Sequence, residues 1–231
     1  NSYSTGRPVF QEYMLRLPAT IKLAFWALLV SVIIAIPIGI ISAVKQYSFF
    51  DNFGMTISLL GVATPNFWLG LMLILLFAVN LGWFPSGGSG GLKYIILPAI
   101  TLGTGQAGLA SRMTRSSMLE IIRQDYIRTA RAKGLAEKTV ILRHALKNAL
   151  IPIVTVLGSQ FGHALGGAMI TETIFSWPGV GRLMIDAINK YDRPTVIGCV
   201  VMLCIMISVV NLIVDILYVF IDPRVRTEYS K

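Results

Sequence analysis

Residues Tyr126–Pro152 read YIRTARAKGLAEKTVILRHALKNALIP, a polar and basic stretch that lies between long apolar runs. The segment Arg112–Lys147, which we call the basic island, carries nine Lys or Arg residues and three acidic residues. The island therefore supplies most of the formal net charge of +9. Because charged side chains are costly in hydrocarbon, this segment must lie in water, and the apolar runs are arranged on either side of it.

Composition indicates that most of the chain is surrounded by lipid. Hydrophobic residues make up 55% of the chain and charged residues 13%, and the mean hydropathy is +0.70. Soluble domains contain about 25% charged residues, so this composition excludes an ordinary soluble domain. We expect an integral membrane protein.

The apolar runs predict an all-α protein with five transmembrane helices, because a helix needs about 20 residues to cross the hydrocarbon. Residues 1–22 precede the first span, the transmembrane domain covers 23–221 with a polar loop at 111–150, and 222–231 form a tail. The chain starts with neither an initiator Met nor a cleavable signal pattern, so we expect a sixth, upstream helix in the natural protein. The five expected spans are about 23–44, 55–80, 94–110, 151–171 and 195–221.

The distribution of Lys and Arg predicts the orientation of these spans. Successive segments between spans lie on alternate sides of the membrane. If the basic island is cytoplasmic, segments 45–54 and 222–231 are also inside, and segments 1–22, 81–93 and 172–194 are outside. The inner segments, island included, then hold 13 Lys or Arg residues and the outer segments 7. This asymmetry agrees with the positive-inside rule. We therefore expect the first residues outside and the C-terminus in the cytoplasm.

Three local patterns within the spans carry predictions. Pro65 predicts a kink in the second span. Residues 103–108 match GxGxxG by letter, but they lie in an apolar segment without a strand, turn and helix, which argues against nucleotide binding there. Gly158, Gly162 and Gly166 stand four residues apart and share one helix face, so they predict close helix packing, either within this chain or against a partner.

Ionisable and amide side chains within spans are expensive to keep and are therefore candidates for function. The candidates for a solute pathway are Gln160, His163, Asn211 and Glu172, and Gln106 is a further amide of this kind. For His163 and Asn211, hydrogen bonding between helices is the alternative role.

The island itself predicts a short amphipathic helix. Gly134 is expected to end one helical segment, after which Leu142, Ala145, Leu146 and Ala149 recur at helical spacing. Such a helix would lie across its neighbours at the inner face. It could dock into a groove on another protein, or it could meet anionic lipid headgroups.

Sequence motifs for catalysis or energy conversion are missing from this chain. There is no GxxxxGK[ST], HExxH or GxSxG, and His144 and His163 are the only histidines. We therefore expect no enzyme activity, no cofactor and no metal site in this chain. Energy for any transport would have to come from a partner.

Several motifs, spread over nearly all of the chain after Pro18, resemble those of the ABC importer permeases of the dipeptide, oligopeptide and nickel group. Two positions depart from that family's usual pattern: Arg128-Thr129-Ala130 replaces Glu-Ala-Ala of the broad consensus, and Tyr191-Asp192-Arg193-Pro194 replaces Arg-Asp-Tyr-Pro. The motifs are QDYIRTARAKGL at 124–135, RHALKNALIP at 143–152, PNFWLG at 65–70, ILPA at 96–99, ETIFSWPGVG at 172–181 and the segment from Asp215 through Asp222-Pro223-Arg224.

This resemblance implies a permease subunit in the bacterial cytoplasmic membrane that forms a path for di- or oligopeptides with a second, homologous permease. It also implies two ATP-binding subunits on the cytoplasmic side and an extracytoplasmic substrate-binding protein near 172–194. A nickel-chelate importer of the same group is one alternative, and an ion channel or secondary transporter is another. The residues that the resemblance implies for coupling to the ATPases are Arg128, Thr129, Ala130, Arg131, Lys133, Gly134, Leu135, Arg143 and His144.

Overall fold

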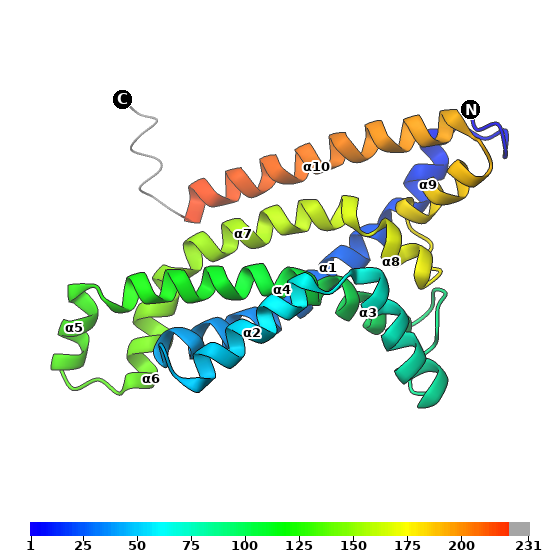
Figure 1. Ribbon diagram of the computed structural model, residues 1–231. Helices are drawn as coiled ribbons and strands as arrows, with labels where there is room; N and C mark the ends of the chain where they lie inside the picture. Colours follow the sequence, from blue (N-terminus) through cyan, green and yellow to red (C-terminus); the bar gives the residue numbers. More distant parts are fainter. Residues whose placement is uncertain (222–231) are drawn as a thin grey trace, which may run out of the picture.

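A computed structural model describes the backbone of residues 1–221 and the side chains of residues 1–216 (Figure 1). All regular secondary structure in this described part is helical, and the predicted tail 222–231 with its Asp222-Pro223-Arg224 motif lies outside it. The helices are α1 Val9–Val44, α2 Phe49–Ala63, α3 Asn66–Leu73, the π-helix η1 Ile74–Asn80, α4 Lys93–Ile122, α5 Asp125–Ala132, α6 Glu137–Thr139, the π-helix η2 Val140–Ala145, α7 Leu146–Gly167, α8 Met169–Ile174, α9 Val180–Asn189 and α10 Arg193–Ile221.

Helices α1 and α4 pack closely against each other because glycines face the contact. A Cβ atom at Gly39 of α1 would collide with Thr114 of α4, and one at Gly103 of α4 would lie 2.5 Å from the carbonyl oxygen of Ala27. Ala27 of α1 thus lies beside Gly103 of α4, and Gly39 lies beside Thr114, so the two helices run parallel. Small residues set this separation, as is common between membrane helices.

Helix α4 extends beyond the third predicted span, 94–110, and continues through the first part of the predicted loop 111–150. Within the described residues it does not reach the apolarity of the other long helices. Buried hydroxyl groups explain why the predicted third span is shorter than α4. Thr101, Ser111 and Thr114 are buried, and each donates a hydrogen bond to the carbonyl four residues earlier in α4. Because neighbouring helices cover these groups, α4 need not be apolar.

Among the described residues, three helical stretches are long and apolar enough to cross a membrane: Val9–Val44, Glu137–Gly167 and Arg193–Ile216. They contain most of the predicted spans 23–44, 151–171 and 195–221. The first helix begins at Val9, so most of segment 1–22, expected to precede the first span, is helical and continuous with it. With 36 residues, α1 is about 54 Å long, which exceeds the roughly 30 Å of hydrocarbon.

The predicted second span, 55–80, is two helices that meet at a bend of 99°. The predicted kink at Pro65 is therefore confirmed. Proline lacks the amide hydrogen of a helix interior and pushes the preceding residue out of helical geometry, and Thr64 accordingly has ψ 121°. Beyond the bend, α3 and η1 turn away from the bundle (Figure 1), and η1 buries none of its residues.

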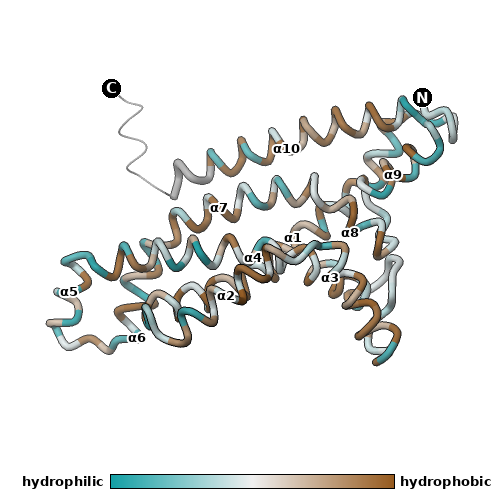
Figure 2. The backbone as a smooth tube through the Cα atoms, viewed as in Figure 1, coloured by the Kyte–Doolittle hydropathy of each residue, from teal (hydrophilic) through white to brown (hydrophobic). Residues whose placement is uncertain are grey.

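The bundle has two distinct ends (Figure 1). The turn between α1 and α2, helices α5 and α6, and the last turn of α10 lie at one end, which we call the inner end. The N-terminus, α8 and α9 lie at the opposite end, the outer end. Hydrophobic residues follow most of α10 between the two, whereas hydrophilic residues gather at α5 and near α9 (Figure 2).

Candidate functional sites at the ends and in the middle of the bundle

Helix α5 is fixed at the inner end by its apolar face. Ile127 is fully buried and Ala130 nearly so, in one cluster with Met118 of α4. The hydroxyl of Tyr126 accepts a hydrogen bond of 2.8 Å from the amide of Asn148 in α7. These contacts hold α5 in place while its opposite face remains exposed.

The turn after α5 is closed by a charged pair. Gly134 has φ 77°, a left-handed conformation that glycine adopts without strain, and the predicted helix end there is confirmed. Arg131 binds the carboxylate of Glu137 through two hydrogen bonds, of 2.7 and 3.0 Å. Both side chains are substantially exposed, so the pair adds only about 0–1 kcal/mol to stability. Its main effect is to fix the shape of the turn.

Most of the residues predicted to couple to an ATPase are exposed at this end. Ala130 is buried and His144 is half-buried, so neither offers much surface to a partner. We call the exposed side chains of α5 and the following turn the inner basic surface. The exposed members of the predicted set are Arg128, Thr129, Arg131, Lys133, Gly134 and Leu135 on that surface, and Arg143 on η2.

The predicted amphipathic helix around Leu142–Ala149 is not a separate helix. It is the beginning of the continuous stretch Glu137–Gly167, in which η2 leads directly into α7. No residue between Leu142 and Ala149 breaks the helix, but Figure 1 shows α6 and η2 lying across the inner end, at a clear angle to α7. Ala145 and Ala149 are buried as the stripe predicts, but Leu142 is exposed. Helix α5 lies across the inner end as well (Figure 1).

An ion pair that the sequence did not reveal joins α2 to α4 near the inner end. The guanidinium of Arg115 donates two hydrogen bonds of 2.7 Å to the carboxylate of Asp51. Asp51 is buried, and it also accepts a hydrogen bond from the backbone of Tyr47. The partners are 64 residues apart, so no local pattern could have paired them.

Glu172, predicted as a pathway residue, is instead enclosed at the outer end. Its carboxylate accepts hydrogen bonds from the hydroxyl of Thr20, at 2.7 Å, and from the backbone of Arg182, at 3.1 Å. The Thr20 hydroxyl also accepts a hydrogen bond from the backbone of Val180 at the start of α9. A Cβ atom at Gly179 would collide with this carboxylate. Glu172 therefore joins α1, α8 and the N-terminus of α9, and its side chain has no exposed surface.

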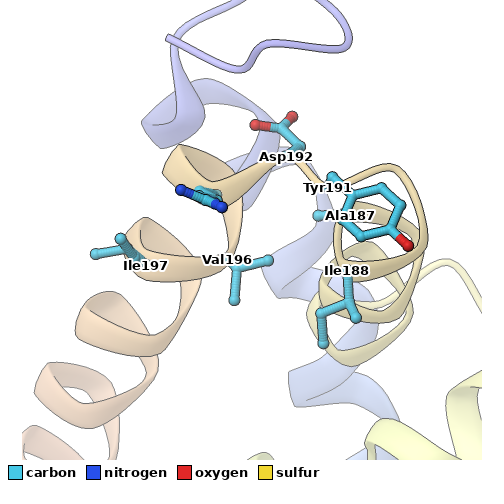
Figure 3. Close-up of a pocket in the computed structure, with 7 residues that line it drawn as sticks. Ala187, Ile188, Tyr191, Asp192, Val196 and Ile197 are labelled. Atoms are coloured by element: carbon cyan, nitrogen blue, oxygen red, sulfur yellow. The ribbon is translucent and has the colours of Figure 1, made fainter.

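A second enclosed acid, Asp192, ties the N-terminus to the turn before α10. Its carboxylate accepts hydrogen bonds from the Ser2 and Thr195 hydroxyls and from the backbone of Tyr3. Burial alone would raise the pKa of Asp192, but these hydrogen bonds hold the pKa well below its usual range. Figure 3 shows the carboxylate directed away from the exposed Tyr191.

A cavity of about 370 Å³, with several polar side chains in a largely apolar lining, lies between α4, α7 and the bend after α2. Gln160 and His163 of the predicted pathway set line it, together with Gln106. Asn66, directly after the bend, and Arg112 of α4 complete its polar lining. The bend thus brings a third chain segment to the cavity.

The remaining candidates face the contact between α7 and α10. A Cβ atom at Gly158 would collide with Val214, and one at Gly162 would lie 2.8 Å from Oδ1 of Asn211. A Cβ atom at Gly166 would lie 3.5 Å from Ile207. The glycines therefore bring α10 close within this chain, and Asn211 lies against α7, away from the cavity.

The glycines of the GxGxxG pattern also serve helix packing. Besides Gly103 against α1, a Cβ atom at Gly108 would collide with the backbone of Ser58 in α2, and one at Gly105 would lie 3.2 Å from Oδ1 of Asn66. The pattern allows α4 to sit between α1 and α2.

Comparison with protein families gives a match over residues 35–227 to the family described as binding-protein-dependent transport system inner membrane component. The chain is 45% identical to the dipeptide transport system permease protein DppB of Alkalihalophilus pseudofirmus, over 97% of this chain and 76% of that protein. It is 43% identical to the glutathione transport system permease protein GsiC of Pectobacterium atrosepticum, over 97% of this chain and 74% of that protein.

Solved structures show the same fold. An inward-facing structure of the MetNI methionine ABC transporter aligns with a TM-score of 0.79 and 18% identity, over 94% of this chain and all of that one. A crystal structure of an amino acid ABC transporter with histidines aligns with a TM-score of 0.70 and 15% identity, over 90% of this chain and 94% of that one.

Proposed function

Because this chain belongs to the family of binding-protein-dependent transport system inner membrane components, we propose that it is the permease subunit of an ABC importer that carries di- and oligopeptides. The observation that carries the substrate class is the similarity over 97% of the chain to a permease named for dipeptides. Further relatives are named for oligopeptides and for di- and tripeptides, which favours peptides over nickel. A channel or a secondary transporter does not fit the family.

The inner basic surface is the proposed contact with the ATPases. It combines exposed cations, Arg128, Arg131 and Lys133, with a rigid base formed by the buried Ile127 and the pairing of Arg131 with Glu137. A short helix held in this way can enter a groove on a partner and transmit its movement to α4 and α7. In this proposal the inner end faces the cytoplasm and the N-terminus faces outward.

The proposed assembly contains a second, homologous permease, two ATP-binding subunits and an extracytoplasmic binding protein. Exposed apolar residues along α10 and α3 support burial against lipid or the second permease, because a monomer in water would not expose so large an apolar area. The outer end, with α9 and the Asp192 turn, would receive the loaded binding protein.

The test is transport by the complete assembly in liposomes. We expect radiolabelled dipeptide to accumulate only when ATP, the ATPase subunits and the binding protein are all present. Nickel(II), offered alone or as a chelate, should not accumulate. Accumulation of dipeptide by this chain without any ATPase, or accumulation of nickel chelate instead of dipeptide, would contradict the proposal.

A further inference from the structure

The cavity between α4, α7 and the α2 to α3 bend contains amide groups that the described part of the chain leaves without partners. Gln160 is 6% exposed, and neither its Oε1 nor its Nε2 forms a hydrogen bond with another described residue. Oε1 of Gln106, on the facing helix, is likewise buried and without a partner there. Buried polar groups are normally hydrogen-bonded, so both side chains are suited to a partner that enters the cavity.

The charge of the cavity complements an anion. Arg112 is exposed to the cavity region, and no carboxylate in the described residues forms a salt bridge with it. The lining contains no acidic side chain. An arginine guanidinium can bind both oxygens of a carboxylate, and no competing acid stands beside it here.

Apolar residues form most of the rest of the wall, beside Asn66 and His163. Val62, Leu102 and Leu109 line the cavity beside the polar groups, so apolar side chains of a ligand can be accommodated without specific contacts. The volume of about 370 Å³ falls within the usual range of ligand pockets, about 300–1,000 Å³. Gly105 keeps the wall open, because a Cβ atom there would lie 3.2 Å from Oδ1 of Asn66.

From this geometry we propose that the cavity binds the transported peptide by its backbone, with Gln106 and Gln160 pairing with a peptide group and Arg112 pairing with the terminal carboxylate. This inference rests on the proposed function and adds to it a binding site with its chemistry. A glutamine amide offers one acceptor and two donors, which complements both the N–H and the C=O of a peptide group. Recognition of these common groups, with apolar walls for the rest, admits peptides of many sequences.

The test uses the complete importer in liposomes, with binding protein saturated either with the dipeptide Ala-Phe or with its C-terminally amidated form. Gln160→Leu removes the amide at similar size and should lower uptake of both peptides per ATP hydrolysed by at least tenfold. Arg112→Gln should lower uptake of the free acid at least tenfold but leave uptake of the amidated form near its original value. Because all variants receive the same binding protein, its own preference cancels between variants.

The matched controls are Ser159→Ala, which alters the next residue of α7, and Arg123→Gln, which removes one positive charge at the end of α4. Ser159 and Arg123 are exposed outside the cavity, so both controls should transport like the unmodified chain. Assembly, checked by size-exclusion chromatography, should be unchanged in all four variants, and basal ATP hydrolysis should be unchanged in the two controls.

Normal uptake by Gln160→Leu and Arg112→Gln would overturn the site while leaving the proposed function intact. An equal loss of free and amidated peptide in Arg112→Gln would overturn the pairing of Arg112 with the carboxylate. If the unmodified importer carried neither peptide, the proposed function itself would fail.

Discussion

Two acids at the outer end of this bundle and the cations of the inner basic surface are used in opposite ways. At the outer end, the acids Glu172 and Asp192 are buried and their carboxylates are hydrogen-bonded to groups from distant parts of the chain. At the inner end, Arg128 and Lys133 are exposed, and Arg131 is paired only with the nearby Glu137.

The difference indicates which charged groups are satisfied within the chain and which are available to a partner. The outer acids satisfy their hydrogen bonds within the chain, so their removal should affect folding. The inner cations sit on a rigid base but direct most of their charge outward, so their removal should affect a partner. Each prediction below tests this contrast, and the expected energies decrease from one to the next.

Replacement of Glu172 by alanine should have the largest effect on stability. It leaves Thr20 and the N-terminus of α9 without their buried acceptor, which should cost about 3 kcal/mol. Thermal unfolding of the detergent-purified assembly would show this as a lower midpoint.

The control for Glu172→Ala is Glu120→Ala, because Glu120 is an exposed acid on α4. Its midpoint should stay near that of the unmodified protein. Equal shifts in the two variants would mean that the enclosed carboxylate of Glu172 has no special structural role.

Asp192→Asn should cost about 2 kcal/mol, because charge-assisted hydrogen bonds from Ser2, Tyr3 and Thr195 are weakened. The depressed pKa of Asp192 also predicts a pH dependence. Since the folded pKa lies below the unfolded value of about 3.9, the contribution is full above that value and is lost as the pH falls further.

Unfolding midpoints measured between pH 7 and pH 3 would test this dependence. The unmodified protein should lose stability below about pH 4 more steeply than Asp192→Asn. Asp186→Asn, at an exposed acid of α9, should follow the unmodified protein. Parallel curves for Asp192→Asn and the unmodified protein would contradict the enclosed role of Asp192.

Charge reversal on the inner basic surface should spare the fold and impair transport. The double substitution Arg131→Glu with Lys133→Glu should lower uptake per ATP hydrolysed at least tenfold, which corresponds to about 1.4 kcal/mol. The unfolding midpoint should change little, because both side chains are exposed. Co-purification of the ATPase subunits should fall with uptake.

Two further measurements distinguish contact of the inner basic surface with an ATPase from its contact with lipid. Arg7→Glu with Lys190→Glu reverses two exposed charges at the outer end and should leave ATPase co-purification unchanged. Liposomes without anionic lipid should preserve coupled uptake by the unmodified importer. Loss of coupling in neutral liposomes alone, with ATPase binding intact in the inner variant, would favour the lipid contact instead.

Features with a local cause could be predicted from the sequence. Pro65 bends the second span and Gly134 ends α5, because each effect depends on the backbone of one or two residues. The exposure of Arg128 and Lys133 followed from the charge of the island between apolar runs. The helical class followed from the length of those runs.

Features that depend on distant partners could not be predicted. Glu172 resembled a pathway residue until Thr20, 152 residues away, was found to donate to its carboxylate. The reach of α4 was underestimated because hydropathy does not register that its hydroxyls are hydrogen-bonded within the helix and covered by neighbours. The stripe from Leu142 to Ala149 has helical spacing, but spacing alone does not say whether a helix joins the next one.

The smallest predicted effect compares two glycines that share one backbone conformation at the two ends. Gly134 has φ 77° and Gly82 has φ 64°, and a Cβ atom at either would meet no atom within 4 Å. Alanine at either position should therefore cost about 1 kcal/mol of stability through the left-handed backbone alone. Gly91→Ala, at a glycine with open space around it and no positive φ, should cost less stability than either.

If the turn at Gly134 presents the inner basic surface to an ATPase, Gly134→Ala should also lower uptake per ATP hydrolysed, whereas Gly82→Ala should not. Equal uptake by these two variants would show that the shape of the inner turn is not used for coupling.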